Sequence, residues 1–407
     1  MFLARIVEEV VHSDGARVLA GLIRLTGDFE AAEDALQEAY ARALTVWARD
    51  GIPDRPAAWL NTVSRRIALD RIRRDRTTSL PEDLELAAPE TENEEMHEIE
   101  DDRLRLLFTC CHPALSPEAR CGLALRTLGG LTTREISRAF VEPEATTAQR
   151  LVRAQRKIRD ARIPYEVPPR EKLPERVGTV LSVLYLIFNE GYASTDAPSL
   201  LRPDLVAEAI RLARLTVELL PGESEAKGLL ALMLLTDARR AARLSADGEL
   251  VLLDEQDRSL WNRAQIEEGS RVLDDALATR NAGPYQIQAA IASLHALAAT
   301  AAETDWPQIA VLYASLLRVA PTPIIELNAA VALGLATTLD RALEWIARIE
   351  ASGALANYHL LPAAKADLLR RLGRNDDAAT AYGEALALAT NPAERRYLER
   401  RRRECAL

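Results

Sequence analysis

Glutamine and basic side chains recur along residues 144–159 at a spacing suited to contact with nucleic acid. The set comprises Gln149, Arg150, Arg153, Arg156, Lys157 and Arg159. In the major groove of DNA, arginine forms paired hydrogen bonds with guanine, and glutamine forms them with adenine. The spacing predicts a base-reading helix, with Leu151 and Ile158 buried on its other side.

A short helix and a turn are expected just before this basic helix. Thr132 and Glu135 form a capping-box pattern, in which a hydroxyl and a carboxylate each accept a hydrogen bond from a free backbone N–H. Pro143 suits the first position of the second helix, where a backbone N–H is dispensable. The layout predicts a helix-turn-helix, although Val141 stands where such turns commonly have glycine.

Another helix, expected within residues 56–76, carries an excess of arginine. Only Asp70 and Asp75 oppose this charge. The arginines are Arg65, Arg66, Arg71, Arg73, Arg74 and Arg76. So much positive charge on one helix indicates a polyanionic partner.

The segment 28–48 reads as an amphipathic helix with an acidic face. Its apolar stripe is predicted to be Ala32, Leu36, Ala39, Tyr40, Ala43, Leu44 and Trp47. Asp34, Gln37 and Glu38 share another face, at the i, i+3, i+4 spacing. Two interpretations stay open: an ordinary solvated acidic face, or a docking surface for a basic partner.

Two residue clusters could suggest other chemistry. Cys110, Cys111, His112 and Cys121 suggest a zinc site, but adjacent cysteines on a helix diverge by about 100°, and paired CxxC spacing is missing. Small buried thiols that pack a helix explain them better. The segment 188–192, "FNEGY", is either a helix C-terminus capped by Gly191 or a contact surface that docks the C-terminal part of the chain onto the preceding helical units. Nothing in the sequence supports catalysis, a cofactor or a metal.

The composition predicts a helical protein with uneven charge. The chain has 407 residues, 48% of them hydrophobic, and a net charge of −10. Residues 77–102 carry 11 acidic and no basic side chains, whereas residues 103–163 carry 12 basic and 5 acidic ones. Phosphate binding depends on local basic surface, so the acidic total does not exclude nucleic acid. The sequence shows neither a membrane span nor a signal peptide, and cytoplasmic location is expected.

The chain divides into four parts by composition. Helical units are expected at 1–76 and 103–165, joined by an acidic linker at 77–102. An Ala/Leu-rich α-helical extension follows over 166–407. Within it, Gly373, Ala378, Tyr382 and Ala385 are spaced as in a tetratricopeptide (TPR) repeat, so a TPR-like array is predicted.

Together these segments resemble an extracytoplasmic-function (ECF) RNA polymerase sigma factor. "AEDALQEAYARAL" and "AWLNTVSRRIALDRIRR" are similar to sigma region 2, and "LSPEARCGLALRTLGGLTTREISRAFVEPEATTAQRLVRAQRKI" is similar to region 4. "LFTCCHPAL", "YLIFNEGY" and "AGPYQIQAAIASLHA" resemble the subgroup with a long C-terminal TPR-like extension. The resemblance implies an all-α fold: a region 2 bundle, a region 4 helix-turn-helix and the helical extension.

The resemblance also implies partners and site residues. Core RNA polymerase would bind through its β′ clamp helices and β flap, with the clamp helices contacting Asp34, Gln37 and Glu38. The −10 promoter element would be held by Arg65, Arg66, Arg71, Arg73 and Arg74. The −35 element would be contacted by Thr146, Gln149, Arg150, Arg153, Arg156 and Lys157. The acidic linker would run through polymerase channels, or serve only as a solvated tether.

In that subgroup the extension is thought to control activity, through a regulatory protein or a ligand. The chain would be a non-enzymatic cytoplasmic protein, nucleoid-associated in the holoenzyme. Two alternatives are a free-standing helix-turn-helix regulator and a TPR-type interaction scaffold. The acidic helix before an arginine-rich helix argues against the first, and the two sets of arginines argue against the second.

Overall fold

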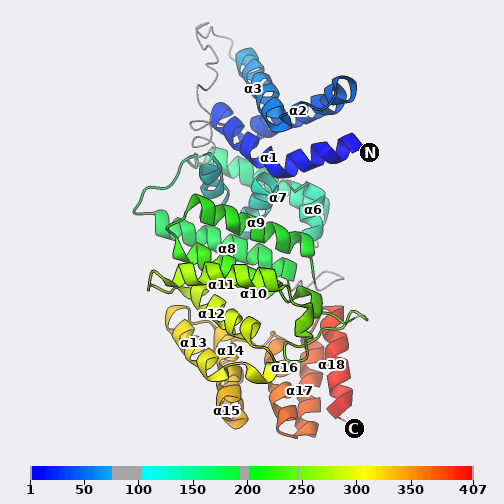
Figure 1. The fold of residues 1–407 in the computed structure, drawn as a ribbon, viewed down its shortest axis with the longest axis vertical. Helices are drawn as coiled ribbons and strands as arrows, with labels where there is room; N and C mark the ends of the chain where they lie inside the picture. Colours follow the sequence, from blue (N-terminus) through cyan, green and yellow to red (C-terminus); the bar gives the residue numbers. More distant parts are fainter. Residues whose placement is uncertain are drawn as a thin grey trace. The chain divides into compact units, whose positions relative to one another are not determined.

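The computed structural model describes residues 2–75, 102–129, 131–140, 142–192, 201–245 and 247–405. Within these ranges the chain is built from helices (Figure 1), and the pairing of Leu244 with Leu250 is an isolated bridge. The predicted all-α fold is confirmed. The chain forms two compact units, Met1–Ile187 and Phe188–Leu407. The acidic linker lies outside the described residues except for Asp102.

The first unit begins with three mutually packed helices, α1 (Phe2–Thr26), α2 (Phe29–Asp50) and α3 (Pro56–Asp75). The Asp28 side chain caps α2 by accepting a hydrogen bond from the backbone N–H of Ala31 at 2.9 Å. The side chains of Trp47 and Trp59 meet edge to face at 5.4 Å between ring centroids. This aromatic contact fixes α3 against α2.

The predicted apolar stripe of α2 is confirmed except at Leu44. The buried members are Ala32, Leu36, Ala39, Tyr40, Ala43 and Trp47. Leu44 is 43% exposed. It lies about 100° around the helix from Ala43, off the line through Ala39, Ala43 and Trp47 that contacts the neighbouring helices.

A second group of helices in this unit contains the predicted helix-turn-helix. Residues 102–110 are helical, and α5 (Pro117–Leu123), the π-helical turn η1 (Ala124–Leu128), α6 (Thr133–Ala139) and α7 (Glu144–Asp160) follow. The capping box is present: the Thr132 backbone N–H donates to Glu135 at 2.7 Å, and that of Glu135 donates to the Thr132 hydroxyl at 3.2 Å. Ile136, Leu151 and Ile158 are buried between these helices.

Pro143 occupies the cap position of α7, not the first helical position that the sequence suggested. Its φ of −59° and ψ of 137° are extended, so the helix begins at Glu144. Proline offers no side-chain hydrogen bond, and the cap has none. Val141, the other unusual turn residue, lies outside the described residues.

The three cysteines of this unit are packed as small buried side chains, as predicted. Cys110, Cys111 and Cys121 are all within the core, and the Cys110 sulfur lies 3.0 Å from the Thr127 hydroxyl oxygen. Burial raises the pKa of the Cys121 thiol to about 12. Among the described residues, no group of three or more His, Cys, Asp or Glu side chains could hold a metal ion.

Helix α8 (Leu173–Tyr192) corrects the interpretation of "FNEGY" as a glycine-capped helix end. Gly191 is helical and has no positive φ. A Cβ at Gly191 would come within 2.8 Å of Leu205 Cβ, so glycine is required for close packing against α9 (Pro203–Leu219). Tyr192 stacks on Phe188 at 5.6 Å, and the Arg243 guanidinium lies 3.8 Å from the centroid of the Tyr192 ring.

The second unit is a succession of helices from α9 onward, in which neighbours along the chain pack against each other (Figure 1). The helices after α9 are α10 (Ser224–Asp237), α11 (Arg263–Leu277), α12 (Pro284–Leu297), α13 (Trp306–Val319), α14 (Pro323–Ala336), α15 (Leu339–Ser352), α16 (Leu360–Arg371), α17 (Asn375–Leu388) and α18 (Pro392–Cys405). Gly373, with φ of 73°, makes the turn between α16 and α17. Ala378, Tyr382 and Ala385 of the repeat-like segment are buried.

The "AGPYQIQ" segment has a local structural explanation. Glu225 Oε2 accepts a hydrogen bond from the backbone N–H of Tyr285 at 2.9 Å, and Oε1 accepts one from that of Gln286 at 3.1 Å. The carboxylate therefore caps α12. A Cβ at Gly283 would meet the Glu225 side chain at 2.4 Å, so glycine admits the capping group.

Acidification should destabilise the second unit through His295. Burial, with Arg239 and Arg258 nearby, lowers the pKa of His295 from 6.5 to about 4. Between pH 6.5 and pH 4 the unfolded chain binds more protons at this position than the folded chain does. The free energy of unfolding therefore falls by up to about 3 kcal/mol as the pH is lowered from 6.5 toward 4. In chemical denaturation of the full chain, His295→Gln should reduce the loss between pH 7 and pH 5. An equal loss in both proteins would contradict this assignment.

Candidate functional site

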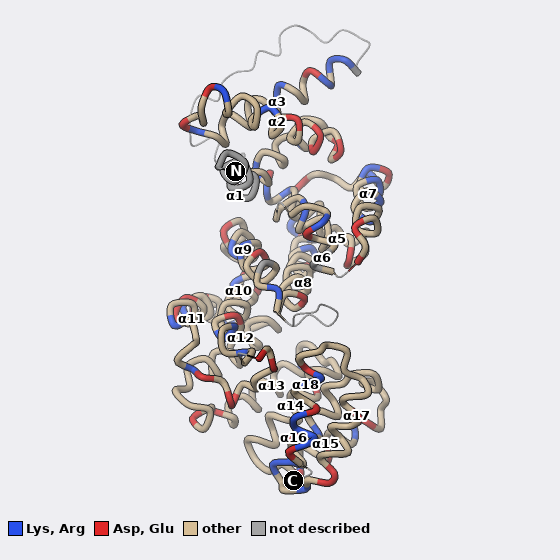
Figure 2. The backbone as a smooth tube through the Cα atoms, turned by 90° about the vertical axis from the view of Figure 1, so that its right-hand side faces the viewer, with Lys and Arg blue, Asp and Glu red and all other residues tan. Residues whose placement is uncertain are grey.

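Helix α7 presents the predicted polar and basic face to solvent. Thr146, Gln149, Arg153, Arg156 and Lys157 are exposed, and blue segments follow this helix in Figure 2. The helix has 17 residues, a length of about 25 Å, which is sufficient to place its N-terminal half in a major groove.

Arg150 differs from its neighbours because Glu142 binds it. Its guanidinium donates to Glu142 Oε1 at 2.7 Å and also to Oε2, and the Thr147 hydroxyl donates to the same carboxylate. These hydrogen bonds to Glu142 stabilise the first turns of α7, where Pro143 provides no side-chain cap. The sequence prediction placed Arg150 among the DNA-contacting residues; in the structure its guanidinium pairs with this carboxylate.

As on α7, most of the predicted DNA-binding arginines of α3 are exposed, whereas one is paired with carboxylates. Arg65, Arg66, Arg73 and Arg74 are exposed. Arg71 is only half exposed and donates to Asp34 Oδ2 at 3.1 Å and to Glu38 Oε2 at 3.0 Å. One predicted DNA-binding arginine therefore pairs with two predicted polymerase-binding carboxylates.

The acidic face of α2 stays accessible around this contact. The Asp34 side chain is 65% exposed, and Gln37 is exposed one turn away. The Arg42 guanidinium donates to Glu38 Oε1 at 2.6 Å. This hydrogen bond, aided by that from Arg71, holds the pKa of Glu38 below its usual value. The face therefore combines fixed negative charge with an uncharged amide.

Asp102 connects the two helical groups of the first unit. Its side chain is buried, its Oδ2 lies 3.0 Å from Arg24 Nε, and its Oδ1 lies 2.7 Å from Arg105 Nη1. The Tyr165 hydroxyl lies 3.0 Å from the carbonyl oxygens of both Ala20 and Asp102. Asp102, which the sequence placed at the end of the acidic linker, is therefore an interior contact, as is Tyr165 at the end of the second helical unit.

Neutralising Asp102 should destabilise the first unit. Asp102→Asn weakens two charged contacts at a buried position, and the free energy of unfolding is expected to fall by about 1–3 kcal/mol. Thermal unfolding followed by circular dichroism would show a lower midpoint for the transition of the first unit. The exposed Asp160→Asn change is the matched control, and equal midpoints for the two variants would refute the role of Asp102.

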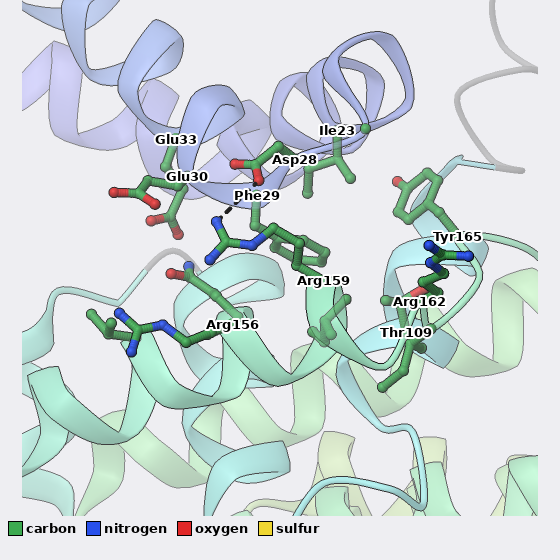
Figure 3. Close-up of a pocket in the computed structure, with 15 residues that line it drawn as sticks. Ile23, Asp28, Phe29, Glu30, Glu33, Thr109, Arg156, Arg159, Arg162 and Tyr165 are labelled. Atoms are coloured by element: carbon green, nitrogen blue, oxygen red, sulfur yellow. Dashed lines mark ion pairs between the residues drawn. The ribbon is translucent and has the colours of Figure 1, made fainter.

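A cleft of about 560 Å³ lies between α7 and the α1–α2 corner (Figure 3). Arg156 and Arg159 line one side, and Asp28, Glu30 and Glu33 line the other. Arg159 Nη1 approaches Asp28 Oδ2 at 3.8 Å. The C-terminal end of the basic helix thus faces carboxylates of the first bundle.

Comparison with known proteins accounts for the acidic face of α2, the arginines of α3 and the basic face of α7 occurring in one chain. Residues 10–78 match the family model described as sigma-70 region 2. Over 390 residues the chain is 43% identical to the uncharacterized protein R00370 of Rhizobium meliloti (strain 1021), covering 94% of this chain and 92% of that protein. It is 31% identical over 154 residues to the probable ECF RNA polymerase sigma factor SigI of Mycobacterium tuberculosis (strain ATCC 25618 / H37Rv). The chain belongs to the ECF sigma factors.

This sigma factor is the form with a long C-terminal extension, and it acts as an alternative sigma factor in transcription initiation. The match to SigI covers 36% of this chain and 52% of SigI. A 156-residue match to the ECF sigma factor SigE of Mycolicibacterium smegmatis, 29% identical, covers 38% of this chain and 60% of SigE. Residues 176–277 of the sigma factor match a family of unknown function, DUF6596. No solved structure matches the chain.

Sequence reasoning missed Glu142, Asp102 and Tyr165 as organising residues of the sigma factor. Glu142 lies eight positions from Arg150, beyond the spacing at which helix patterns are informative. Asp102 resembles its acidic neighbours in the linker. Its burial depends on the distant Arg24 and Tyr165, which only the tertiary structure brings together. Core RNA polymerase and promoter DNA are the partners that the sigma-factor relationship implies.

Proposed function

We propose that three surfaces of this sigma factor divide promoter recognition between them. The α2 face formed by Asp34, Gln37 and Glu38 binds the β′ clamp helices of core polymerase. The α3 arginines hold the −10 element, and α7 reads the −35 element, with region 4 lying on the β flap. The exposed glutamine–arginine face of α7 is the structural observation that supports this division most directly.

Charge and exposure support the polymerase-binding role of α2. Asp34 and Glu38 carry negative charge, and Gln37 between them is exposed. Carboxylates on an exposed helix attract a basic partner surface and favour one orientation of it. Their pairing with Arg71 holds the carboxylates in place and leaves most of Asp34 open to solvent.

The arginines of α3 supply the electrostatic part of promoter binding. Four of them are exposed toward the C-terminal half of the helix: Arg65, Arg66, Arg73 and Arg74. Each phosphate contact releases condensed counterions, so binding through this helix weakens steeply as salt rises. Arg71 joins the two surfaces, because it belongs to the DNA-binding helix and pairs with the polymerase-binding one.

On α7, Gln149 and Arg153 are the strongest candidates for base contacts, since both are exposed, Gln149 in the second turn and Arg153 at the middle of the helix. Arg156 and Lys157 follow one turn later and suit phosphate contacts. Arg150 takes a positioning role through Glu142, or exchanges that carboxylate for a guanine when DNA binds. Thr146 lies in the first turn of α7, where its hydroxyl can reach a phosphate.

The extension regulates these surfaces in our proposal. It has hydrophobic clusters of its own, such as that around Ile346, Leu361 and Leu368, and it forms a separate compact unit. A domain of this size with its own core can carry a regulatory partner or ligand without contributing to promoter contacts. The assembly would act in the cytoplasm, associated with the nucleoid in the holoenzyme.

Footprinting of the reconstituted holoenzyme tests the assignment of surfaces. The full chain is mixed with core polymerase, separated by size-exclusion chromatography and incubated with the promoter of its own operon. Co-elution and protection of both the −35 and −10 elements are expected. Co-elution without −35 protection would reject the role of α7, and failure to co-elute would reject that of α2.

A further inference from the structure

The extension contains a cavity of about 370 Å³ that belongs to none of the promoter or polymerase surfaces. Side chains from α12, α13, α14, α16 and α18 line it, together with Leu250, Leu252 and Leu253. All of these elements belong to the second unit. The volume lies in the range of pockets that bind small organic molecules.

Aromatic rings form much of the wall. They come from three separate places in the chain, which the fold brings to one cavity: Trp306 and Tyr313 on α13, Tyr358 before α16, and Tyr397 on α18. His295 meets Trp306 edge to face at 5.2 Å. Leu252, Leu327 and Val331 complete an apolar surface. Such a lining favours a ligand with an apolar or aromatic body.

The full charges carried by the lining residues are negative, although Arg239 and Arg258 act electrostatically on His295 from behind the wall. Asp367 and Glu394 contribute carboxylates, and none of the described residues that line the cavity is a lysine or an arginine. Arg370 and Arg371, behind the wall, bind Asp367 at 2.6 and 2.7 Å and largely compensate its charge. Glu394 Oε2 lies 3.2 Å from His359 Nε2, and the Arg243 guanidinium acts on Glu394 electrostatically from behind the wall. No arginine forms an ion pair with Glu394 like those with Asp367, so Glu394 is the less compensated of the two carboxylates.

We propose that this cavity binds a compact organic cation with an apolar body, such as a hydrophobic ammonium or phosphonium ion. Aromatic faces attract cations because their quadrupoles place negative charge over the ring. The Tyr397 ring already contacts Arg400 and Arg401, at 5.7 and 5.5 Å from its centroid, so the cation contacts are assigned to Trp306, Tyr313 and Tyr358. Glu394 supplies the opposite full charge in partly desolvated surroundings, where the attraction exceeds that in water. An anion would meet Glu394 without a cationic side chain in the wall to pair with it.

Equilibrium dialysis with a matched pair of ions tests the proposal on the full chain. Tetraphenylphosphonium and tetraphenylborate have similar size and apolar surface but opposite charge. Saturable binding of one tetraphenylphosphonium per chain is expected, at least about tenfold tighter than that of tetraphenylborate, which corresponds to about 1.4 kcal/mol. Equal binding of both ions, tighter binding of the anion, or no cation binding would overturn the proposal.

Two variants locate the site. Glu394→Gln should weaken tetraphenylphosphonium binding at least about tenfold, and Val331→Trp should block it by filling the cavity. Glu399→Gln, at an exposed position on the same helix, should bind as the parent does. Circular dichroism and melting temperature verify that each variant is folded. Unchanged cation binding in folded Glu394→Gln and Val331→Trp proteins would place the ion elsewhere and reject the site.

The assay contains neither polymerase nor DNA. Its result therefore stands apart from the proposed division of promoter recognition, and either conclusion can fail without the other.

Discussion

Reversing the charges of Asp34 and Glu38 to arginine should lower affinity for core RNA polymerase by about 100-fold, equivalent to nearly 3 kcal/mol. The double change replaces attraction for a basic clamp surface with repulsion, and charge pairs at interfaces commonly contribute on this scale. It also removes both partners of Arg71. Fluorescence anisotropy with labelled sigma factor would measure the affinity.

A third substitution separates the internal role of these carboxylates from their role in docking. Adding Arg71→Glu to the double variant restores opposite charges between α2 and α3. The triple variant should regain melting temperature relative to the double variant, but its core affinity should stay low. Recovery of core binding in the triple variant would show that the two carboxylates act only through Arg71 and that the docking face is elsewhere.

Arg153→Glu should reduce promoter binding by the holoenzyme about 10- to 100-fold at moderate salt. The change removes a contact expected to contribute about 1–3 kcal/mol and adds repulsion from the DNA. Arg170→Glu, at an exposed position outside the proposed surfaces, controls for the loss of one positive charge. Gel-shift titration compares the two holoenzymes, and equal losses would mean that Arg153 contributes only general electrostatics.

Substitution of Arg153 and substitution of Arg150 should differ in their effect on protein stability. Because Arg150 binds Glu142 beside the helix-turn-helix, its substitution is expected to affect folding as well as DNA binding. Arg153 lies exposed on the helix, so its reversal should leave the melting temperature unchanged.

The helices could be predicted from the sequence because their signals are local. Periodic apolar residues in α2, the capping box at Thr132 and the glycine turn at Gly373 each act within a few residues. The exceptions depend on contacts that periodicity does not contain. Leu44 matches the helical spacing and is nevertheless exposed, whereas Gly191 is required by its approach to Leu205 and not by a turn.

The sequence identified which residues belong to each candidate surface. It did not indicate which of their side chains contact one another. Spacing correctly placed Gln149 and Arg153 on an exposed face of α7. It gave no sign that Arg71 would pair with Asp34 and Glu38, more than thirty residues away. The cavity in the extension was also invisible to sequence patterns, because its four aromatic residues come from segments spread over 306–397.

Run-off transcription tests the central claim most directly. Core polymerase is supplied with the promoter of the sigma factor's own operon, with and without the full chain, and with the Arg153→Glu variant. Transcripts that appear only with the parent chain and fall sharply with the variant are the predicted result. Transcription that is equally strong with the variant, or absent with the parent chain, would contradict promoter recognition through α7.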